Sequence, residues 1–161
     1  MKNLLIGIST IGLLIACAAE TQTSATVENL SSPSEIKSAS AVDIDQAAWG
    51  DFLSYFTDDT HMLKPVLVGV AKIKAGEQIH PPHRHADEEY LMVLKGHGTW
   101  YLNGEETTAN EGDILYARAW DYHGIRAADD SPLDFVVFKY SARGMDAPTD
   151  PSPELPEELS P

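Results

Sequence analysis

Hydrophobic residues in the second half of the chain occur in short runs that are rich in β-branched and aromatic side chains. Gly, Pro and Asn separate these runs from Leu63 onward. This pattern is typical of short strands joined by turns, and the spacing predicts an antiparallel barrel or sandwich. The expected fold class is therefore all-β. The expected strands are residues 65–73, 88–95, 98–102, 105–109, 113–117, 122–127 and 133–140.

Three dipeptides between these runs predict turns. Asn103-Gly104 separates two strand-like runs and predicts a two-residue hairpin, because both turn positions tolerate positive φ. Lys95-Gly96 and Glu111-Gly112 indicate further turns.

The stretch from Asp43 to Asp59 has a different pattern. The apolar residues at helical spacing, behind two aspartates that could cap a helix, are Trp49, Phe52, Leu53 and Phe56. The pattern is compatible with a short N-terminal helix, and an irregular strand is the alternative.

The first sixteen residues predict a signal peptide. Lys2 is followed by an uncharged stretch from Leu4 to Ala16, which as a helix would span about 20 Å at about 1.5 Å per residue. That length is short of the roughly 30 Å hydrocarbon layer of a bilayer. The sequence Leu14-Ile15-Ala16-Cys17 resembles the lipobox of bacterial lipoproteins, which implies acylation of Cys17 after export. An ordinary secretory signal with a chance cysteine is the alternative.

The resemblance to a lipoprotein implies that the chain is anchored to the cell envelope by its N-terminal lipid only. Ala18 after the cysteine implies the periplasmic face of the outer membrane. Residues 17–40 are rich in Ser and Thr with few apolar side chains, which predicts a disordered tether. Residues 41–145 are the expected single domain, and residues 146–161 are an acidic, Pro-rich tail that we expect to be disordered.

Composition excludes several classes of function. The chain has 161 residues and a formal net charge of -14, which repels the phosphate backbone and argues against nucleic-acid binding. The single cysteine excludes an internal disulfide framework and a cysteine-rich zinc module. Nucleophile elbows and dinucleotide-binding glycine motifs are also absent from the sequence.

The segment from His80 to Glu89 holds the strongest chemical signal. Residues two apart on a strand share a face, so we expect the side chains of His83 and His85 to point the same way. Glu89 shares their parity if the strand continues. Imidazole and carboxylate groups together are ligands that divalent transition metals prefer.

These residues resemble the two motifs of the cupin superfamily, with Arg118 and Trp120 at positions where the second motif usually has Pro and Gly. The resemblance implies a small single-domain β-barrel of the double-stranded β-helix or jelly-roll type. It also implies one divalent metal ion held by His83, His85, Glu89 and His123, with two coordination positions left open. The matching residues are Gly76, His83, His85, Glu89 and Gly96 in the first motif, and Gly112 and His123 in the second.

Residues of the pocket wall are harder to assign from sequence. Tyr101, Tyr116 and Arg118 lie close to the motifs and are candidates for the pocket, with Arg118 as an anchor for an anionic group of the substrate. The alternative is that they belong to the core or to a dimer interface.

The other polar residues near the motifs have simpler expected roles. His80 is expected in a loop, with a place beside the metal ligands as the alternative. We expect His61 and His97 to be solvated, and Arg84 and Glu88 to be surface charges because they alternate away from the metal-facing set.

A metal ion is the only reactive centre that the sequence supports, and its ligands suit Fe(II), Mn(II), Ni(II), Co(II) or Zn(II). The preferred hypothesis is an enzyme that binds a small organic molecule at the metal, as a dioxygenase or as an isomerase or lyase. The alternative is an envelope protein that binds a metal or metabolite without turnover. The resemblance further implies a homodimer.

Overall fold

The structure, a computed structural model, describes residues 33–151. The predicted signal peptide, the lipidation site Cys17 and most of the predicted tether lie outside the described residues, as do residues 152–161 of the predicted tail. Within the part that the structure describes, no helix is long and apolar enough to cross a membrane.

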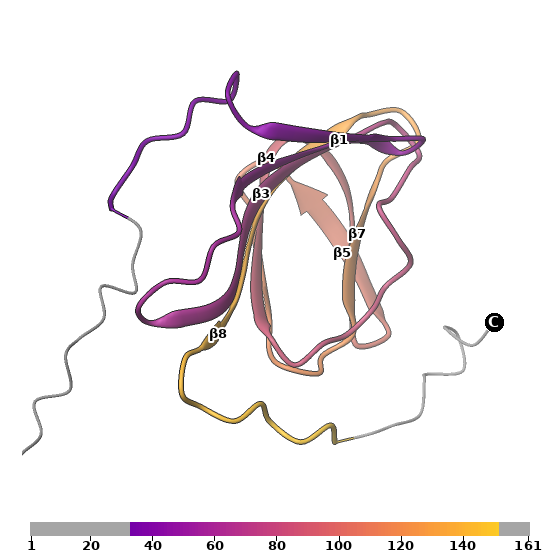
Figure 1. Ribbon diagram of the computed structural model, residues 1–161. Coiled ribbons are helices and arrows are strands. Elements are labelled where there is room, and N and C mark those ends of the chain that lie inside the picture. The colour runs from indigo at the N-terminus through magenta and orange to yellow at the C-terminus, as the bar shows by residue number, and fades with distance from the viewer. Residues whose placement is uncertain (1–32, 152–161) are drawn as a thin grey trace, which may run out of the picture.

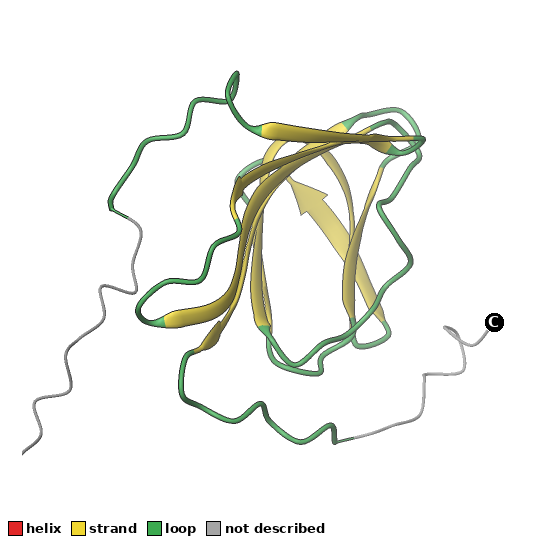
Figure 2. Ribbon diagram, in the orientation of Figure 1, coloured by secondary structure: helices red, strands yellow, loops and turns green. Residues whose placement is uncertain are grey.

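Antiparallel strands form a barrel (Figures 1 and 2). A long loop, residues 74–87, lies before the fourth strand and carries His83 and His85. The strands are β1 (Asp43–Ala47), β2 (Gly50–Phe56), β3 (Leu63–Ile73), β4 (Glu88–Leu102), β5 (Glu105–Asn110), β6 (Ile114–Ala117), β7 (His123–Ala127) and β8 (Leu133–Ala142).

The long strand β4 holds the barrel together. The main path of the sheet runs β1-β2-β3-β8-β4-β5, and β6 and β7 also pair with β4. The first half of β4 pairs with β6 and β8, and its second half pairs with β5 and β7. One strand therefore contributes to both walls of the barrel, and the interior lies between them (Figure 2).

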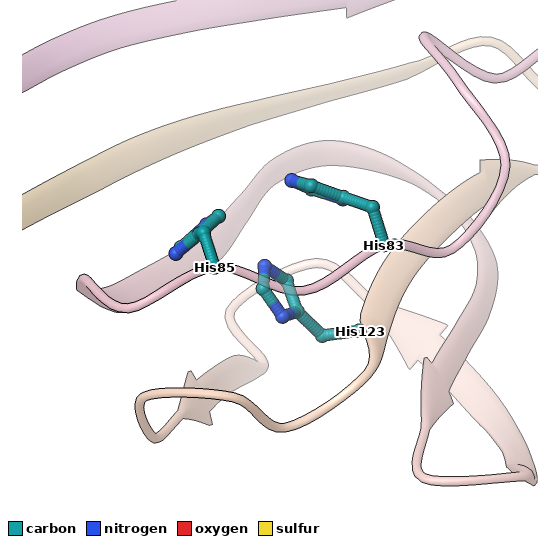
Figure 3. A group of neighbouring side chains, drawn as sticks. All are labelled: His83, His85 and His123. Carbon is teal, nitrogen blue, oxygen red and sulfur yellow. The ribbon is translucent and has the colours of Figure 1, made fainter. Parts of the chain in front are cut away.

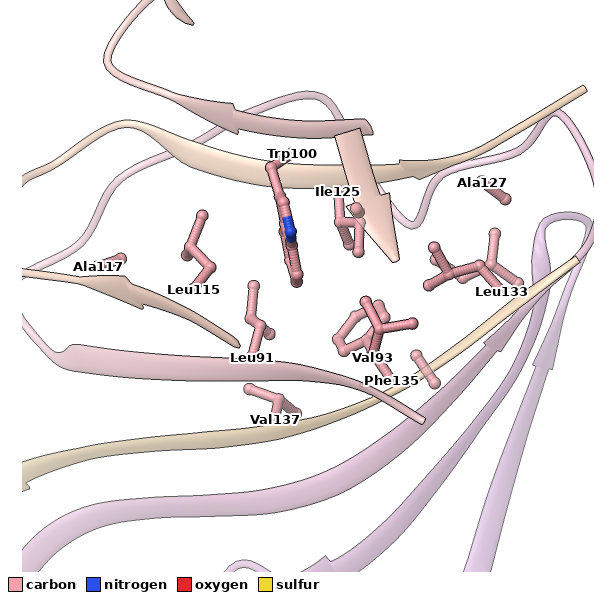
Figure 4. Close-up of a cluster of buried hydrophobic side chains, with 13 residues drawn as sticks. Leu91, Val93, Trp100, Leu115, Ala117, Ile125, Ala127, Leu133, Phe135 and Val137 are labelled. Carbon is pink, nitrogen blue, oxygen red and sulfur yellow. The ribbon is translucent and has the colours of Figure 1, made fainter. Parts of the chain in front are cut away.

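The core fills the interior with side chains that alternate along the strands. Leu91 and Val93 of β4 lie beside their cross-strand partners Val137 and Phe135 of β8. Trp100 packs against them from the opposite wall (Figure 4). All five side chains are at most 6% exposed. Tyr90 and Met92 have the opposite parity and lie on the outer face of the barrel.

The all-β fold predicted from the sequence is confirmed, and six strands follow the expected runs closely. The predicted runs 88–95 and 98–102 are one strand, so a turn at Lys95-Gly96 is wrong. Gly96 has a φ of 81°, and the register between β4 and β8 shifts just before it, between Val93 and Lys95. The glycine therefore marks a β-bulge inside a continuous strand. The predicted hairpin at Asn103-Gly104 is confirmed, with φ values of 50° and 90°.

A short N-terminal helix is wrong, and the strand alternative is correct. Residues 43–56 form the β1-β2 hairpin, in which Asp45 pairs with Phe52. β2 pairs in turn with β3, so the sheet supplies its hydrogen bonds. Phe52 and Leu53 are adjacent on β2 and point to opposite faces, whereas a helix would have placed them on one apolar stripe.

Candidate metal centre

Two segments that are distant in sequence are joined by their backbones at the site. The N–H of His83 donates to the carbonyl oxygen of His123 at 3.0 Å, and the N–H of His123 donates to the carbonyl oxygen of His83 at 2.9 Å. His123 is the first residue of β7, so the bridge fixes the loop before β4 against the end of a regular strand. The N–H of Trp120 donates to the carbonyl oxygen of His85 at 2.7 Å and holds the same two segments a second time.

The three histidine side chains converge inside this frame. One ring nitrogen each of His83, His85 and His123 lies within 4.8 Å of the other two. The ring of His123 lies 4.8 Å from that of His83 and 5.0 Å from that of His85, measured between centroids. Figure 3 shows the three rings directed toward a common space.

Hydrogen bonds to the backbone decide which nitrogens face that space. Nδ1 of His123 lies 2.8 Å from the carbonyl oxygen of Asp121, and Nδ1 of His85 lies 3.0 Å from that of Asp87. A carbonyl oxygen only accepts, so each Nδ1 donates its N–H there and each Nε2 is the nitrogen directed at the common space. This is the arrangement by which proteins orient metal-binding histidines.

Glu89, the second residue of β4, completes the cluster. Its side chain is 9% exposed, with Oε2 lying 3.1 Å from Nε2 of His85 and Oε1 lying 3.6 Å from Nε2 of His123. The second distance is longer than a hydrogen bond, so that contact is electrostatic. The four side chains predicted from the sequence to bind metal are therefore brought together.

The donor set fits a divalent metal ion. Within residues 33–151, Nδ1 of His83 and Nε2 of His123 are buried without a hydrogen-bond partner. A buried nitrogen lone pair without a partner costs free energy, and a bound cation would satisfy it. Three imidazoles and one carboxylate, without a thiolate, suit Fe, Mn, Co, Ni or Zn.

Electrostatics keep two of these groups in the form that binds metal. Burial, together with the neighbouring rings of His80, His123 and His85, lowers the pKa of His83 to about 4, so its imidazole is neutral at pH 7. Burial alone would raise the pKa of Glu89, but the imidazoles of His123 and His85 outweigh it and lower the pKa to about 2. The carboxylate is therefore ionised. Burial acts to lower the pKa of His123, but the carboxylate of Glu89 and the carbonyl of Asp121 raise it above the usual value.

A cavity of about 310 Å³ opens beside the cluster. His83, Glu89 and His123 lie on its wall, and the rest of its lining is mainly apolar. A volume of this size is at the small end of the range for ligand pockets, so it suits a small organic molecule.

Sequence comparison matches part of the barrel to a known protein family. Residues 69–139 match the family model of the Cupin_2 domain, described as a cupin domain. The match covers less than half of the chain, and it shows that the barrel is similar to a cupin domain over these residues. An RmlC-like cupin from Shewanella frigidimarina has 13% identity, covers 70% of this chain and 95% of its own, and superposes with a TM-score of 0.57. A predicted oxalate decarboxylase from Thermotoga maritima has 16% identity, covers 66% of this chain and 98% of its own, and gives a TM-score of 0.54.

Among curated proteins, this chain is similar to a gentisate 1,2-dioxygenase from a Streptomyces species. The identity is 25% over 73 residues, which is 45% of this chain. The match spans 20% of the length of that relative. These similarities support membership of the cupin superfamily, and the structural ones concern the fold.

The three residues predicted for the pocket wall are not among those that line the cavity of the barrel. Tyr116 is 42% exposed, stacks on Tyr90 with ring centroids 4.7 Å apart, and donates its hydroxyl to Glu88 at 3.0 Å. The Arg118 side chain is 71% exposed and binds Asp121 through two hydrogen bonds of 2.9 and 3.0 Å. Tyr101 follows the inward-facing Trp100, and its parity directs it away from the core.

The structure also places the three histidines that were not predicted to bind metal. The ring of His80 lies 4.2 Å from that of His83 and lines the cavity, so the alternative place beside the ligands is the correct one. His97 is half exposed and lies 3.2 Å from Asp130, and His61 is exposed.

Arg84 is not the surface charge predicted from the sequence. Its side chain is 12% exposed, pairs with Asp150 at 3.0 Å, and lies over the ring of Tyr122 at 5.0 Å from the centroid. The alternation that predicted exposure does not apply, because Arg84 lies in the loop before β4. The described part of the tail covers it.

Trp120 adopts a backbone conformation that suits glycine. Its φ is 70°, which is uncommon for a bulky residue, and it lies where the second cupin motif usually has Gly. The indole Nε1–H donates to the carbonyl oxygen of Pro148 at 2.7 Å. The tail therefore contacts the loop that carries His83 and His85, through Arg84, and the turn just before His123, through Trp120.

Sequence reasoning missed the cavity residues that come from other strands. Asp45, Trp49 and Phe52 of the N-terminal hairpin line the cavity, as does Lys139 of β8. The signal for Lys139 was available, because it has the same parity as Phe135 and Val137 in a predicted strand.

Proposed function

We propose that this chain is a mononuclear metal cupin that acts on a small organic molecule bound in the cavity beside the metal. The observation that carries the proposal is the convergence of three imidazoles, two of them with buried nitrogens that lack a partner among the described residues. His83, His85, His123 and Glu89 would hold the ion.

A divalent ion at this position would act as a Lewis acid toward an oxygen atom of the substrate. The residues of the chain supply the orientation of the ligands, the negative charge and the exclusion of water. The carbonyls of Asp121 and Asp87 fix the rings of His123 and His85, so the site needs little reorganisation when it binds. Glu89 supplies the negative charge that partly neutralises the ion, and the apolar cavity wall excludes water from one side.

Dioxygenase-type chemistry is the first candidate reaction. The similarity to a gentisate 1,2-dioxygenase supports it, over the 73 residues that match. Isomerase or lyase chemistry would need a group that carries a proton. His80 lies on the cavity wall beside His83 and would be that group.

A protein that binds a metal or a metabolite without turnover is the second candidate. It is favoured by the mainly apolar lining of the cavity, to which the described residues contribute no tyrosine. Both candidates need the same four ligands and differ only in turnover.

Oxygen uptake distinguishes the two. We expect the iron-loaded protein to consume oxygen with a chelating substrate, so diols, hydroxy acids and β-diketones would be screened in an oxygen electrode. Iron-loaded His123→Ala protein is the matched control and should show no uptake above buffer. Tight binding of such compounds without consumption or product, under every metal tested, would favour the binding protein instead.

We also propose that the chain is exported, acylated at Cys17 and held at the periplasmic face of the outer membrane. The lipobox-like sequence before Cys17 supports this proposal. Cells that express the chain with a radiolabelled fatty acid should label the wild type and not Cys17→Ser. Equal labelling of both would refute the proposal.

A homodimer is the assembly that we propose. The outer face of the sheet formed by β4, β6 and β8 exposes a group of apolar side chains, and such a patch is typical of an interaction surface. Light scattering should give twice the mass of the chain, and a mass of one chain at micromolar concentration would contradict the dimer. The exposed residues are Met92, Leu94, Ile114, Tyr116 and Phe138.

A further inference from the structure

Lys139 occupies an inward-facing position in the wall of the cavity. It follows Phe135 and Val137 at alternate positions of β8, and all three line the cavity. In the sheet it pairs with Leu67 on one side and with Glu89 on the other. Inward positions of a barrel are usually apolar, and a lysine there is usually paired with an acid.

The ammonium group of Lys139 has no such pair. Among residues 33–151, no carboxylate oxygen lies within 4.0 Å of its Nζ. Glu89 is its direct neighbour across the strands, yet the carboxylate of Glu89 contacts the imidazoles of His85 and His123 instead. Asp45 also lines the cavity, but it belongs to the exposed edge strand β1. Lys139 therefore brings a positive charge without a carboxylate partner among the described residues to the cavity wall.

The rest of the cavity offers an apolar surface. Trp49, Phe52 and Phe135 bring three aromatic rings to its wall. The Phe52 ring lies over Gly69, where a Cβ atom would come within 2.4 Å of Phe52 Cζ, so the glycine makes room for the ring. Aromatic rings of this kind favour a flat or apolar ligand body.

We propose that the cavity binds a small carboxylic acid with an apolar or aromatic body. Lys139 binds the carboxylate through its ammonium group, and the body packs against Trp49, Phe52 and Phe135. The metal ligands lie on the same cavity wall, so the acid is held beside them. This inference rests on the proposed function and adds the chemical class of its substrate. Lys139 is then a residue that determines specificity.

The test compares an acid with its uncharged isostere. Phenylacetate and phenylacetamide have the same shape and differ in charge, and their affinities would be measured by calorimetry on the metal-loaded protein. Because a charge-assisted hydrogen bond is lost with the amide, we expect the wild type to prefer the acid by about tenfold or more. Lys139→Met should abolish most of that preference, and Lys139→Arg should keep it.

Lys72→Met is the matched control. Lys72 lies on the neighbouring strand β3 with an exposed side chain, so this variant removes the same charge from outside the cavity. It should keep the full preference for the acid. Thermal unfolding of each variant confirms that it is folded, and methionine at position 139 suits an apolar wall.

Elemental analysis of the same samples separates this inference from the proposed function. Normal metal content with a preference that is lost only in Lys139→Met supports both. Normal metal content with an unchanged preference in Lys139→Met, or with no binding of either compound to the wild type, overturns the role of Lys139 and leaves the metal site standing. A wild type that binds no metal overturns the proposed function, whereas a Lys139-dependent preference for the acid in that protein would still support the anion site.

Discussion

His123→Ala is expected to weaken metal binding by at least about a hundredfold. The variant removes a ligand whose ring is 1% exposed and is already oriented by the carbonyl of Asp121. Loss of a residue that merely supports a ligand typically lowers metal affinity by about 10-fold to 100-fold, and loss of the ligand itself should cost more. The measurement is metal content of protein purified without chelators, followed by competition with a chelator of known affinity.

His61→Ala is the control for this experiment, because His61 is exposed. It should bind as much metal as the wild type. His123→Gln keeps a polar side chain at the buried position, so it separates the loss of metal from a loss of folding, which circular dichroism would detect. Equal metal content in His123→Ala and His61→Ala would remove His123 from the ligand set.

Gly96→Ala should lower the free energy of unfolding by more than about 3 kcal/mol. Two physical causes add. The φ of 81° disfavours any residue with a Cβ by about 1–2 kcal/mol. A Cβ at this position would also lie 2.0 Å from the carbonyl oxygen of Pro132, so the backbone must move. Urea unfolding followed by tryptophan fluorescence would measure the change.

Gly112→Ala isolates the first cause. Gly112 has a similar φ of 89°, but a Cβ there would meet no atom within 4 Å among the described residues. We therefore expect a loss of only about 1–2 kcal/mol. Equal losses in the two variants would show that close packing against Pro132 contributes nothing to the bulge.

The candidate ligands could be predicted from the sequence because metal chemistry restricts residue type and spacing together. His83, His85 and Glu89 lie close in the chain, and His123 was found through the second cupin motif. The structure brings all four together, although His83 and His85 lie in a loop and not on the strand whose alternation was used to align them. The convergence comes from the backbone bridge between His83 and His123, which no local pattern reveals.

The cavity wall could not be predicted in the same way. An inward lysine such as Lys139 has the same sequence signal as a solvated one, and only the pairing of β8 with β3 and β4 shows which face it occupies. Arg84 was assigned to the surface because it alternates away from the metal-facing set, whereas it lies in a loop and pairs with Asp150. The pocket residues from the N-terminal hairpin were missed because a helix and a strand were both compatible with their spacing.

The pairing register of β4 determines both the position of a metal ligand and the packing of the core. Glu89, Leu91 and Val93 are inward-facing neighbours on one strand, so a slip by one residue would turn the acid outward together with the central core side chains, and would bring Tyr90 and Met92 inside. A molecule with slipped pairing therefore cannot keep a complete set of ligands. Bound metal, measured per chain, should then report the fraction of correctly paired molecules in any preparation whose four ligand residues are intact.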